Sequence, residues 1–363
     1  MTVPVIEPLA EVEGGPLLAG LPKADLHVHQ EAKARLDRVL ARRQGHPSYD
    51  WRGWTRRLLT ERPPGMGRLA GFYEPEVTLG LDVSSDANAE DFIARVADVL
   101  EEGAADGAIL IEVRVGAAQA PPLADLMPLF REAERRVRVR YPHLHAEAIG
   151  YLGLIDDPER LRGAERHLEG YLEGYLQAAP AGLAGLDLRI DPYDTEANPA
   201  LWQIAYRWAA RAAEAGLGIT VHAGEFSSAN LAAALRVPGL GRLGHAVYAA
   251  HDPRLLEEVA RSGVTIECSL TCNVVLGAVL AYETHPIRRF IEHGIPIVLG
   301  TDNPVHICTT IGREYAVAAA LGCSVDDLLT FTRTAVRASF TSAARRAALL
   351  HELDLWEKAH VDA

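Results

Sequence analysis

Histidine and carboxylate side chains follow several short apolar runs of this sequence, where strand ends could bring them to one site. His27 and His29 end the run KADLHVH, and their i, i+2 spacing on an extended strand directs both imidazoles to one face. The run LGITVHA ends near His222, GRLGHAV carries His245, and GTDNPVH carries Asp302. Three imidazoles and one carboxylate from this group suit a borderline divalent ion such as zinc, with water completing its shell. The first prediction is therefore a metal site.

Eight short apolar runs alternate with longer amphipathic segments, which is the pattern of βαβ units in a parallel sheet. We predict strands over residues 23–29, 107–115, 144–152, 185–190, 217–223, 242–247, 263–270 and 295–302, and helices over residues 88–107, 123–140, 199–216 and 252–263. Several helical segments end in glycine just before the next strand, as helix C-termini commonly do. Eight such units predict an α/β protein of the (β/α)8 TIM-barrel class, with its chemistry at the carboxyl ends of the strands.

The chain is expected to form a single barrel domain over residues 1–363, because no low-complexity linker or internal repeat divides it. Its length exceeds the ~250 residues usual for a TIM barrel, which indicates insertions. Residues 30–90 follow the first strand, contain a Gly/Pro-rich centre, and are predicted to form a helical lid over the barrel mouth. Residues 340–363 are predicted to form a C-terminal helical extension.

The charge balance favours a small-molecule partner. The 363 residues include 49 acidic and 36 basic side chains, for a net charge of -13, and the basic ones form no continuous stripe. Nucleic acid or an anionic membrane would require such a stripe, so neither is expected as a partner. No apolar run reaches the roughly 18 residues that span a bilayer, and the first residues lack the features of a signal peptide. We expect a cytoplasmic protein, whose oligomeric state the sequence leaves open.

Eight stretches, in order along the chain, resemble the adenosine deaminase family of metal-dependent amidohydrolases. They are LPKADLHVH, GAILIEVRV, GLDLRID, VHAGE, GRLGHAV, SLTCNVVLGAV, HPIRRF and GTDNPVH, the last followed by IGREYAVAAALG. The resemblance covers nearly the whole chain. It implies an aminopurine pocket, catalytic roles for Glu225 and His245, and a metal held by His27, His29, His222 and Asp302.

Hydrolytic deamination agrees with the chemistry of these residues. A zinc ion lowers the pKa of its bound water to about 7 and makes hydroxide available at neutral pH. Attack on a ring carbon that bears an amino group requires a proton on the adjacent ring nitrogen, and Glu225, three residues after His222, is placed to deliver it. His245 could hold or deprotonate the attacking water. Asp302 could accept a hydrogen bond from that water and help pass its proton to departing ammonia.

Three departures from the family pattern fall on the expected substrate pocket. After the paired histidines the chain reads Gln-Glu-Ala where adenosine deaminases carry Leu-Asp-Gly, and Glu31 could still take a ribose hydroxyl. Arg189 and Ile190 stand where the family has Ala and Gly, and would reshape the sugar and purine edge of the pocket. Asn303 replaces a second aspartate, and we expect its amide to donate to a substrate acceptor such as the purine N7.

A single metal ion is favoured over a two-metal site. Other amidohydrolases bridge two metals with a carboxylated lysine on a barrel strand, but Lys23, Lys33 and Lys358 are the only lysines and none ends a central strand. We therefore predict a hydrolase with one zinc ion per chain that deaminates adenosine or a modified adenine nucleoside or base. Two alternatives stay open: a sister amidohydrolase that deaminates another amino-heterocycle, and a non-catalytic metal-binding ligand sensor.

Overall fold

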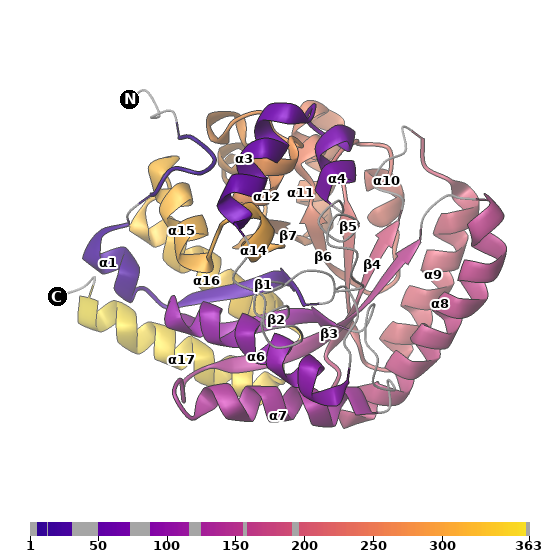
Figure 1. Cartoon of the computed structure of the whole chain (residues 1–363), viewed down its shortest axis with the longest axis horizontal. Helices are drawn as coiled ribbons and strands as arrows, with labels where there is room; N and C mark the ends of the chain where they lie inside the picture. The colour runs from indigo at the N-terminus through magenta and orange to yellow at the C-terminus, as the bar shows by residue number, and fades with distance from the viewer. Residues whose placement is uncertain are drawn as a thin grey trace.

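Eight parallel strands form the centre of the molecule, and helices surround them (Figure 1). This computed structural model describes residues 6–12, 14–30, 50–72, 88–115, 125–154, 158–190 and 196–360, with the side chains of residues 158–167 left aside. The strands pair in chain order: β1 (Lys23–His29), β2 (Ala108–Val115), β3 (His145–Leu154), β4 (Gly185–Ile190), β5 (Gly218–Ala223), β6 (Leu240–His245), β7 (Thr265–Cys268) and β8 (Ile297–Leu299). This order confirms the (β/α)8 barrel predicted from the sequence.

Several helices, among them α9 (Pro199–Glu214), begin after a residue whose side chain caps the first turn. Helix α9 follows Asn198, whose side chain accepts a hydrogen bond from the Ala200 N–H at 2.9 Å. The others are α1 (Gly15–Gly20), α3 (Trp51–Glu61), α4 (Met66–Phe72), α6 (Ala89–Ala105), α7 (Leu126–Arg138), α8 (Pro158–Ala178), α10 (Leu231–Ala234), α11 (Pro253–Ser262), α12 (Leu270–Leu276), α13 (Ile287–Glu292), α14 (Pro304–Ile307), α15 (Ile311–Ala320), α16 (Val325–Ala338) and α17 (Ala343–His360), with short 3-10 turns at η2 (Ala179–Ala181), η3 (Val247–His251) and η4 (Tyr282–Thr284). The predicted helices over 88–107, 123–140, 199–216 and 252–263 correspond to α6, α7, α9 and α11.

The barrel closes between β1 and the segment that follows β8. The His29 N–H donates to the Asp302 carbonyl at 2.9 Å, and the Asp302 N–H donates to the His27 carbonyl at 2.6 Å. Alternation along β1 sends Ala24 and Leu26 outward, into a hydrophobic cluster with α16 and α17, and sends the histidines inward. Strand pairing therefore places three predicted metal ligands side by side at one end of the barrel.

Phe340 closes the opposite end of the barrel. Its ring lies against Gly185 of β4 and Gly218 of β5, where an added Cβ would come within 2.4 Å and 2.1 Å of ring carbons. The guanidinium of Arg242 lies 3.8 Å from the centroid of the same ring. A side chain at either glycine would displace Phe340, so these small residues keep this end of the barrel packed.

Helices α3 and α4 fall within the predicted lid and lie beside α12 and α14 (Figure 1). The indole rings of Trp51 and Trp54 contact the ring of His306 in α14, with centroids 4.2 Å and 5.5 Å from it. Residues 31–49 and 73–87 of the insertion lie outside the described residues. A lid over the barrel mouth therefore stays a prediction, as does the treatment of the whole chain as a single domain.

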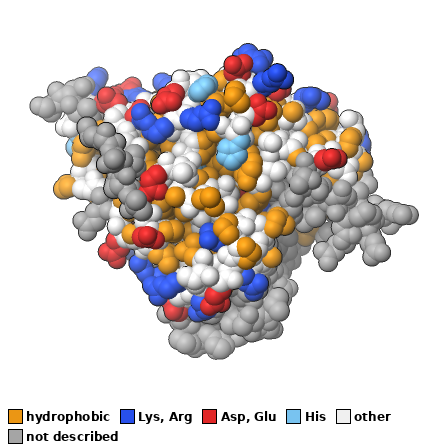
Figure 2. Space-filling view, turned by 90° about the horizontal axis from the view of Figure 1, so that it is seen from above, with side chains coloured by type: hydrophobic (Ala, Val, Ile, Leu, Met, Phe, Trp, Pro, Cys, Tyr) orange, Lys and Arg blue, Asp and Glu red, His pale blue; other side chains and the backbone are white. Residues whose placement is uncertain are grey.

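The described surface carries charges of both signs. Lys and Arg side chains lie among Asp and Glu side chains on the face shown in Figure 2, with apolar and uncharged atoms between them. Some of these charges pair across the surface, as Arg136 does with Glu90 at 2.6 Å. Within the described ranges, no helix has the length and hydropathy needed to cross a membrane. The mixed charge agrees with a small-molecule partner.

Candidate metal centre and active site

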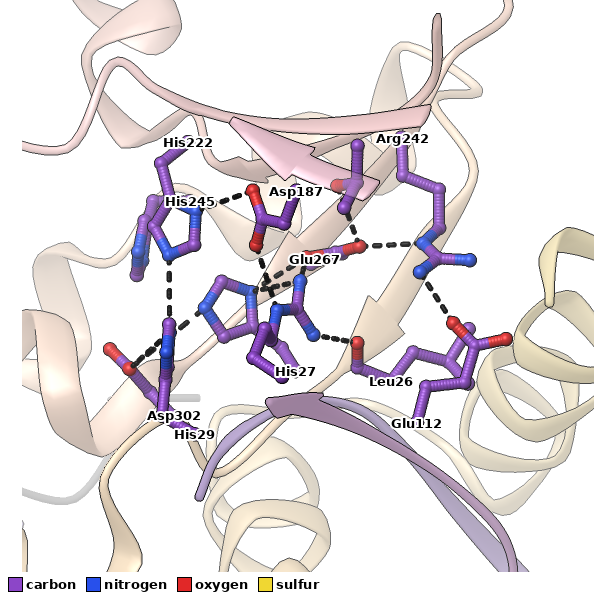
Figure 3. Close-up of polar contacts among 12 residues, drawn as sticks. Leu26, His27, His29, Glu112, Asp187, His222, Arg242, His245, Glu267 and Asp302 are labelled. Atoms are coloured by element: carbon purple, nitrogen blue, oxygen red, sulfur yellow. Dashed lines mark hydrogen bonds and ion pairs between the residues drawn. The ribbon is translucent and has the colours of Figure 1, made fainter. Parts of the chain in front are cut away.

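Four of the predicted residues meet at the carboxyl ends of β1 and β5 and in the loop after β8 (Figure 3). The Nε2 atoms of His29 and His222 lie 3.3 Å apart. A carboxylate oxygen of Asp302 lies 3.4 Å from His29 Nε2 and 3.9 Å from His27 Nε2. All four side chains are buried. Donor atoms this close can share one ion at the roughly 2.0–2.2 Å bond lengths of zinc, so this cluster is a candidate metal site.

Hydrogen bonds behind two of the histidines determine which ring nitrogen faces the site. His27 Nδ1 lies 2.6 Å from Glu267 Oε2, and His222 Nδ1 lies 2.9 Å from Asp187 Oδ1. An ionised carboxylate only accepts hydrogen bonds, so each Nδ1 carries a proton and each Nε2 keeps its lone pair. His27 Nε2 is buried and has no hydrogen-bond partner among the described residues. A metal ion would use that lone pair, so the donor set fits zinc.

The backbone at the site adopts uncommon conformations. Asp302 and His245 have left-handed φ angles of 59° and 67°, and such conformations in non-glycine residues cluster at functional sites. Two glycines leave room for His27: a Cβ on Gly300 would lie 2.5 Å from His27 Cβ, and a Cβ on Gly244 would lie 3.0 Å from His27 Cε1. The imidazole of His27 therefore occupies a space that depends on its glycine neighbours.

Glu225 and His245 lie next to the four candidate ligands. Glu225 Oε2 is 3.7 Å from His245 Nε2 and 3.8 Å from Arg189 Nη2. Burial raises the pKa of the Glu225 carboxyl to about 8, although the positive charge of Arg189 opposes the shift. A divalent cation at the adjacent site would lower that pKa again. Burial thus favours the protonated form of Glu225, and a bound cation would favour the ionised form.

A layer of buried charges lies behind the histidines (Figure 3). Arg114 pairs with Asp187 at 2.8 Å and with Glu267 at 2.5 Å. Arg242 pairs with Glu267 and Glu112, at 2.5 Å in both pairs. Burial alone would raise the pKa of Glu267, but the two arginines lower it to about 2. Glu267 therefore stays ionised and remains a hydrogen-bond acceptor for the imidazole in front of it.

Asp187, Glu267 and their two arginines were not predicted as site residues. The signal for Asp187, Arg114 and Glu267 is present in the sequence, because GLDLRI, GAILIEVRV and GVTIECSL each place charged residues inside an apolar run. Parallel strands are buried on both faces, so a charge within such a run must find a partner inside the barrel. The thiol of Cys272, which lies within 4.8 Å of carboxylate oxygens of Glu225 and Asp302, carries no comparable signal.

Of the two predicted substrate-binding residues on β4, one faces the site. Arg189 directs its guanidinium toward Glu225. Ile190 lies on the other face of the strand, buried in the hydrophobic core. The structure thus brings the Arg189 side chain to the candidate site and does not bring the Ile190 side chain there. Glu31, the predicted ribose contact, lies outside the described residues.

Asn303 lies at the rim of the site, beside the candidate ligand Asp302. Its Nδ2 donates a hydrogen bond to Asp302 Oδ1 at 2.6 Å. An amide nitrogen carries two N–H donors, so this contact leaves the second one to serve a substrate acceptor. Tyr151 of β3, which was not predicted, also lies near the rim, with its ring centroid 5.2 Å from that of His29.

Asp187→Asn tests whether the buried carboxylate orients His222. The amide can offer either an acceptor or a donor to Nδ1, so the Nε2 lone pair would no longer be directed consistently at the site. We expect metal affinity, measured by competition with a chelator, to fall about 10- to 100-fold. Asp354→Asn, which alters an exposed carboxylate paired with Arg333, is the matched control and should leave the affinity unchanged. Equal affinities in the parent and in Asp187→Asn would contradict the orienting role.

Comparison with known proteins identifies the family to which the sequence is similar. The family model described as adenosine deaminase matches residues 162–356, slightly more than half of the chain. An adenine deaminase from Rhizobium rhizogenes is 38% identical over 144 residues, which cover 39% of this chain and 45% of that protein. An adenosine deaminase from Erwinia tasmaniensis is 39% identical over 141 residues, which cover 38% of this chain and 42% of that protein. The match thus spans less than half the length of these relatives.

The barrel also resembles solved structures. The crystal structure of an adenine deaminase from Arthrobacter aurescens superimposes with a TM-score of 0.71 at 23% sequence identity. The match covers 93% of this chain and 99% of that chain. At this level of identity the likeness concerns the fold, and it agrees with the strand order described above.

Proposed function

Because this chain belongs to the adenosine deaminase family, we propose that it is a hydrolase that removes the exocyclic amino group of adenine, adenosine or a modified adenine nucleoside. Water supplies the oxygen that replaces the amino group, which leaves as ammonia, or as the corresponding amine where the amino group is substituted. One observation carries the proposal: ligand-type side chains from β1, β5 and the loop after β8 converge with Glu225 and His245 in one buried cluster. TIM-barrel enzymes hold their catalytic residues at this end of the strands.

The metal in this proposal is one zinc ion per chain, held by His27, His29, His222 and Asp302. Two of the imidazoles already direct Nε2 lone pairs into the cluster, which is the form in which histidine binds zinc. When bound there, zinc would supply a water acidic enough to act as a nucleophile at neutral pH. Lys23 lies at the other end of β1, where its ammonium donates to the Leu21 carbonyl at 2.9 Å, so it is not placed to bridge a second metal.

Two carboxyl groups would move protons in this reaction. Glu225 would hold a proton at Oε2 and deliver it to the ring nitrogen beside the carbon under attack, because that nitrogen gains electron density as aromaticity is lost. Asp302 would accept the proton released by the nucleophile and pass it toward the departing ammonia. The charge of Arg189 weakens the hold of Glu225 on its proton, which makes delivery easier.

A deamination panel tests the proposal. Zinc-loaded protein would be assayed against adenine, adenosine, N6-methyladenosine, guanine and cytosine, by the ultraviolet change on deamination and by release of ammonia, or of methylamine from N6-methyladenosine. We expect turnover of adenine or of an adenine nucleoside. Ammonia from guanine or cytosine alone would identify another amino-heterocycle as the substrate. Tight binding of adenine compounds without turnover would indicate that the protein is a ligand sensor and not an enzyme.

Asn303 is proposed as a substrate contact. Asn303→Leu removes its donors and should cost about 1 to 3 kcal/mol of transition-state binding, read from kcat/KM, by leaving a buried substrate acceptor unpaired. In Asn303→Asp, KM should rise with pH, because an ionised carboxylate would face the acceptor and also Asp302. A 7-deaza analogue of the best substrate identifies the acceptor. If the parent turns over that analogue as well as the natural compound, the contact to N7 does not exist.

A further inference from the structure

A chain of buried hydrogen bonds runs from the backbone of α13 toward the site. The backbone N–H of Ile287 donates to His285 Nδ1 at 3.2 Å. A backbone amide nitrogen can only donate, so Nδ1 must accept and the proton of neutral His285 lies on Nε2. Burial lowers the pKa of His285 to about 3, which keeps the imidazole neutral. The backbone of α13 therefore determines the tautomer of His285.

Asn273 links His285 to His245 and transmits the donor and acceptor order of the hydrogen bonds. Its Oδ1 lies 3.3 Å from His285 Nε2, and its Nδ2 lies 3.1 Å from His245 Nδ1. Because His285 Nε2 carries the hydrogen, the amide oxygen must face it, and the amide N–H must face His245. The reversed amide would require a proton on His285 Nδ1, where it would oppose the N–H of Ile287. His245 Nδ1 is therefore an acceptor.

We infer that Ile287, His285 and Asn273 form a positioning relay that holds His245 with an N–H, and not a lone pair, directed into the site. With Nδ1 accepting from the amide, the proton of the neutral imidazole lies on Nε2. That nitrogen is the one that faces Glu225, 3.7 Å from its carboxyl oxygen. The side chains of His285, Asn273 and His245 are all buried, so water does not compete for these hydrogen bonds.

The relay distinguishes His245 from its neighbours. His27 and His222 donate from Nδ1 to carboxylates and direct Nε2 lone pairs into the site, whereas His245 accepts at Nδ1. By distance alone these three imidazoles could also hold a metal, since their ring nitrogens lie within 4.8 Å of one another. An Nε2 that carries hydrogen cannot coordinate a metal, so the relay excludes His245 as a ligand. The proposed ligand set of three histidines and Asp302 stays unchanged.

The catalytic consequence rests on the proposed deamination. An N–H at His245 Nε2 can donate a hydrogen bond to the oxygen of the nucleophile and orient it, but it cannot take up that oxygen's proton. The proton must then go to Asp302. Asn273 and His285 belong to the stretches SLTCNVVLGAV and HPIRRF. Through the relay, these two residues determine that His245 donates a hydrogen bond into the site.

Nitrogen-15 NMR of histidine-labelled, zinc-loaded protein tests the relay, because it reports which ring nitrogen carries hydrogen. The His245 signals are identified by their absence in His245→Gln. We expect a protonated Nε2 and an unprotonated Nδ1, and a proton on Nδ1 of the parent would overturn the relay. The readout does not depend on turnover. Protein with the expected protonation that deaminates nothing would contradict the proposed function and leave the relay standing.

Asn273→Asp replaces the amide N–H with a carboxylate oxygen of nearly the same size. The relay predicts that His245 Nδ1 gains a proton, and that kcat falls roughly 10²-fold or more while KM changes by less than about threefold. Asn230→Asp alters another buried amide, whose Oδ1 accepts from Trp202 Nε1 at 2.7 Å, and should leave the His245 signals unchanged. An unprotonated Nδ1 in Asn273→Asp would overturn the proposal.

His285 variants provide a second test that does not depend on the folding of Asn273→Asp. His285→Gln keeps an N–H donor for Asn273 Oδ1, so His245 should show the parent protonation. His285→Leu removes the donor and lets the amide rotate, so a share of His245 should become protonated on Nδ1. Identical His245 spectra in these two variants would overturn the relay.

Discussion

Glu225→Gln is expected to retain the fold and the metal and to lower kcat by roughly 10²- to 10⁴-fold, the scale of a lost general acid. The amide keeps the size of the side chain but cannot release a proton to the ring. The carboxyl must be protonated before attack, so kcat of the parent should fall as pH rises through the pKa of Glu225. Glu225→Gln should lack that decline. Steady-state kinetics across pH, with elemental analysis of each preparation, measure both effects.

Glu147→Gln is the matched control for this substitution. Glu147 is also buried, and it pairs with Arg131 and Arg345 at 2.8 Å near the start of β3, at the other end of the barrel. Its replacement should lower stability and leave kcat near the parent value. Parent-like turnover in Glu225→Gln would mean that the proton donor has been assigned to the wrong residue.

The barrel could be predicted because hydropathy reports burial and barrel strands are buried. Strands β1 and β4 have the predicted bounds of 23–29 and 185–190. β7 and β8 are shorter than predicted, covering Thr265–Cys268 and Ile297–Leu299. After β7 the apolar run continues directly into the buried helix α12, so hydropathy could not separate the end of the strand from the helix that follows.

The convergence of the polar strand ends could also be predicted, since closing a barrel brings all carboxyl ends of its strands to one mouth. The sequence could also have predicted which face of β4 Ile190 occupies, because period-two alternation places it opposite Arg189. The positions of Asn273 and His285 beside the site could not be predicted, because these residues lie on α12 and just before α13. Their approach to His245 depends on how those short segments pack, which strand spacing does not encode.

His222→Ala is expected to reduce the metal content from one ion per chain to near none after dialysis, and to abolish activity with it. The substitution removes one of three imidazole donors and leaves the Asp187 carboxylate without the ring that it orients. The parent should also gain stability from zinc, by about 2.7 kcal/mol at a free concentration 100 times the dissociation constant, and the variant should not. Elemental analysis and thermal unfolding with and without zinc measure these outcomes.

His293→Ala is the matched control, because His293 is exposed and its Nδ1 lies 2.8 Å from the Arg289 carbonyl, four residues earlier in the sequence. It should keep the parent metal content, activity and zinc-dependent unfolding temperature. The three changes then form a graded series: His293→Ala retains the metal, Asp187→Asn weakens it, and His222→Ala loses it. Two ions per chain in the parent would contradict the single-metal site. Full metal retention in His222→Ala would mean that the cluster of His27, His29 and Asp302 is sufficient without the imidazole from β5.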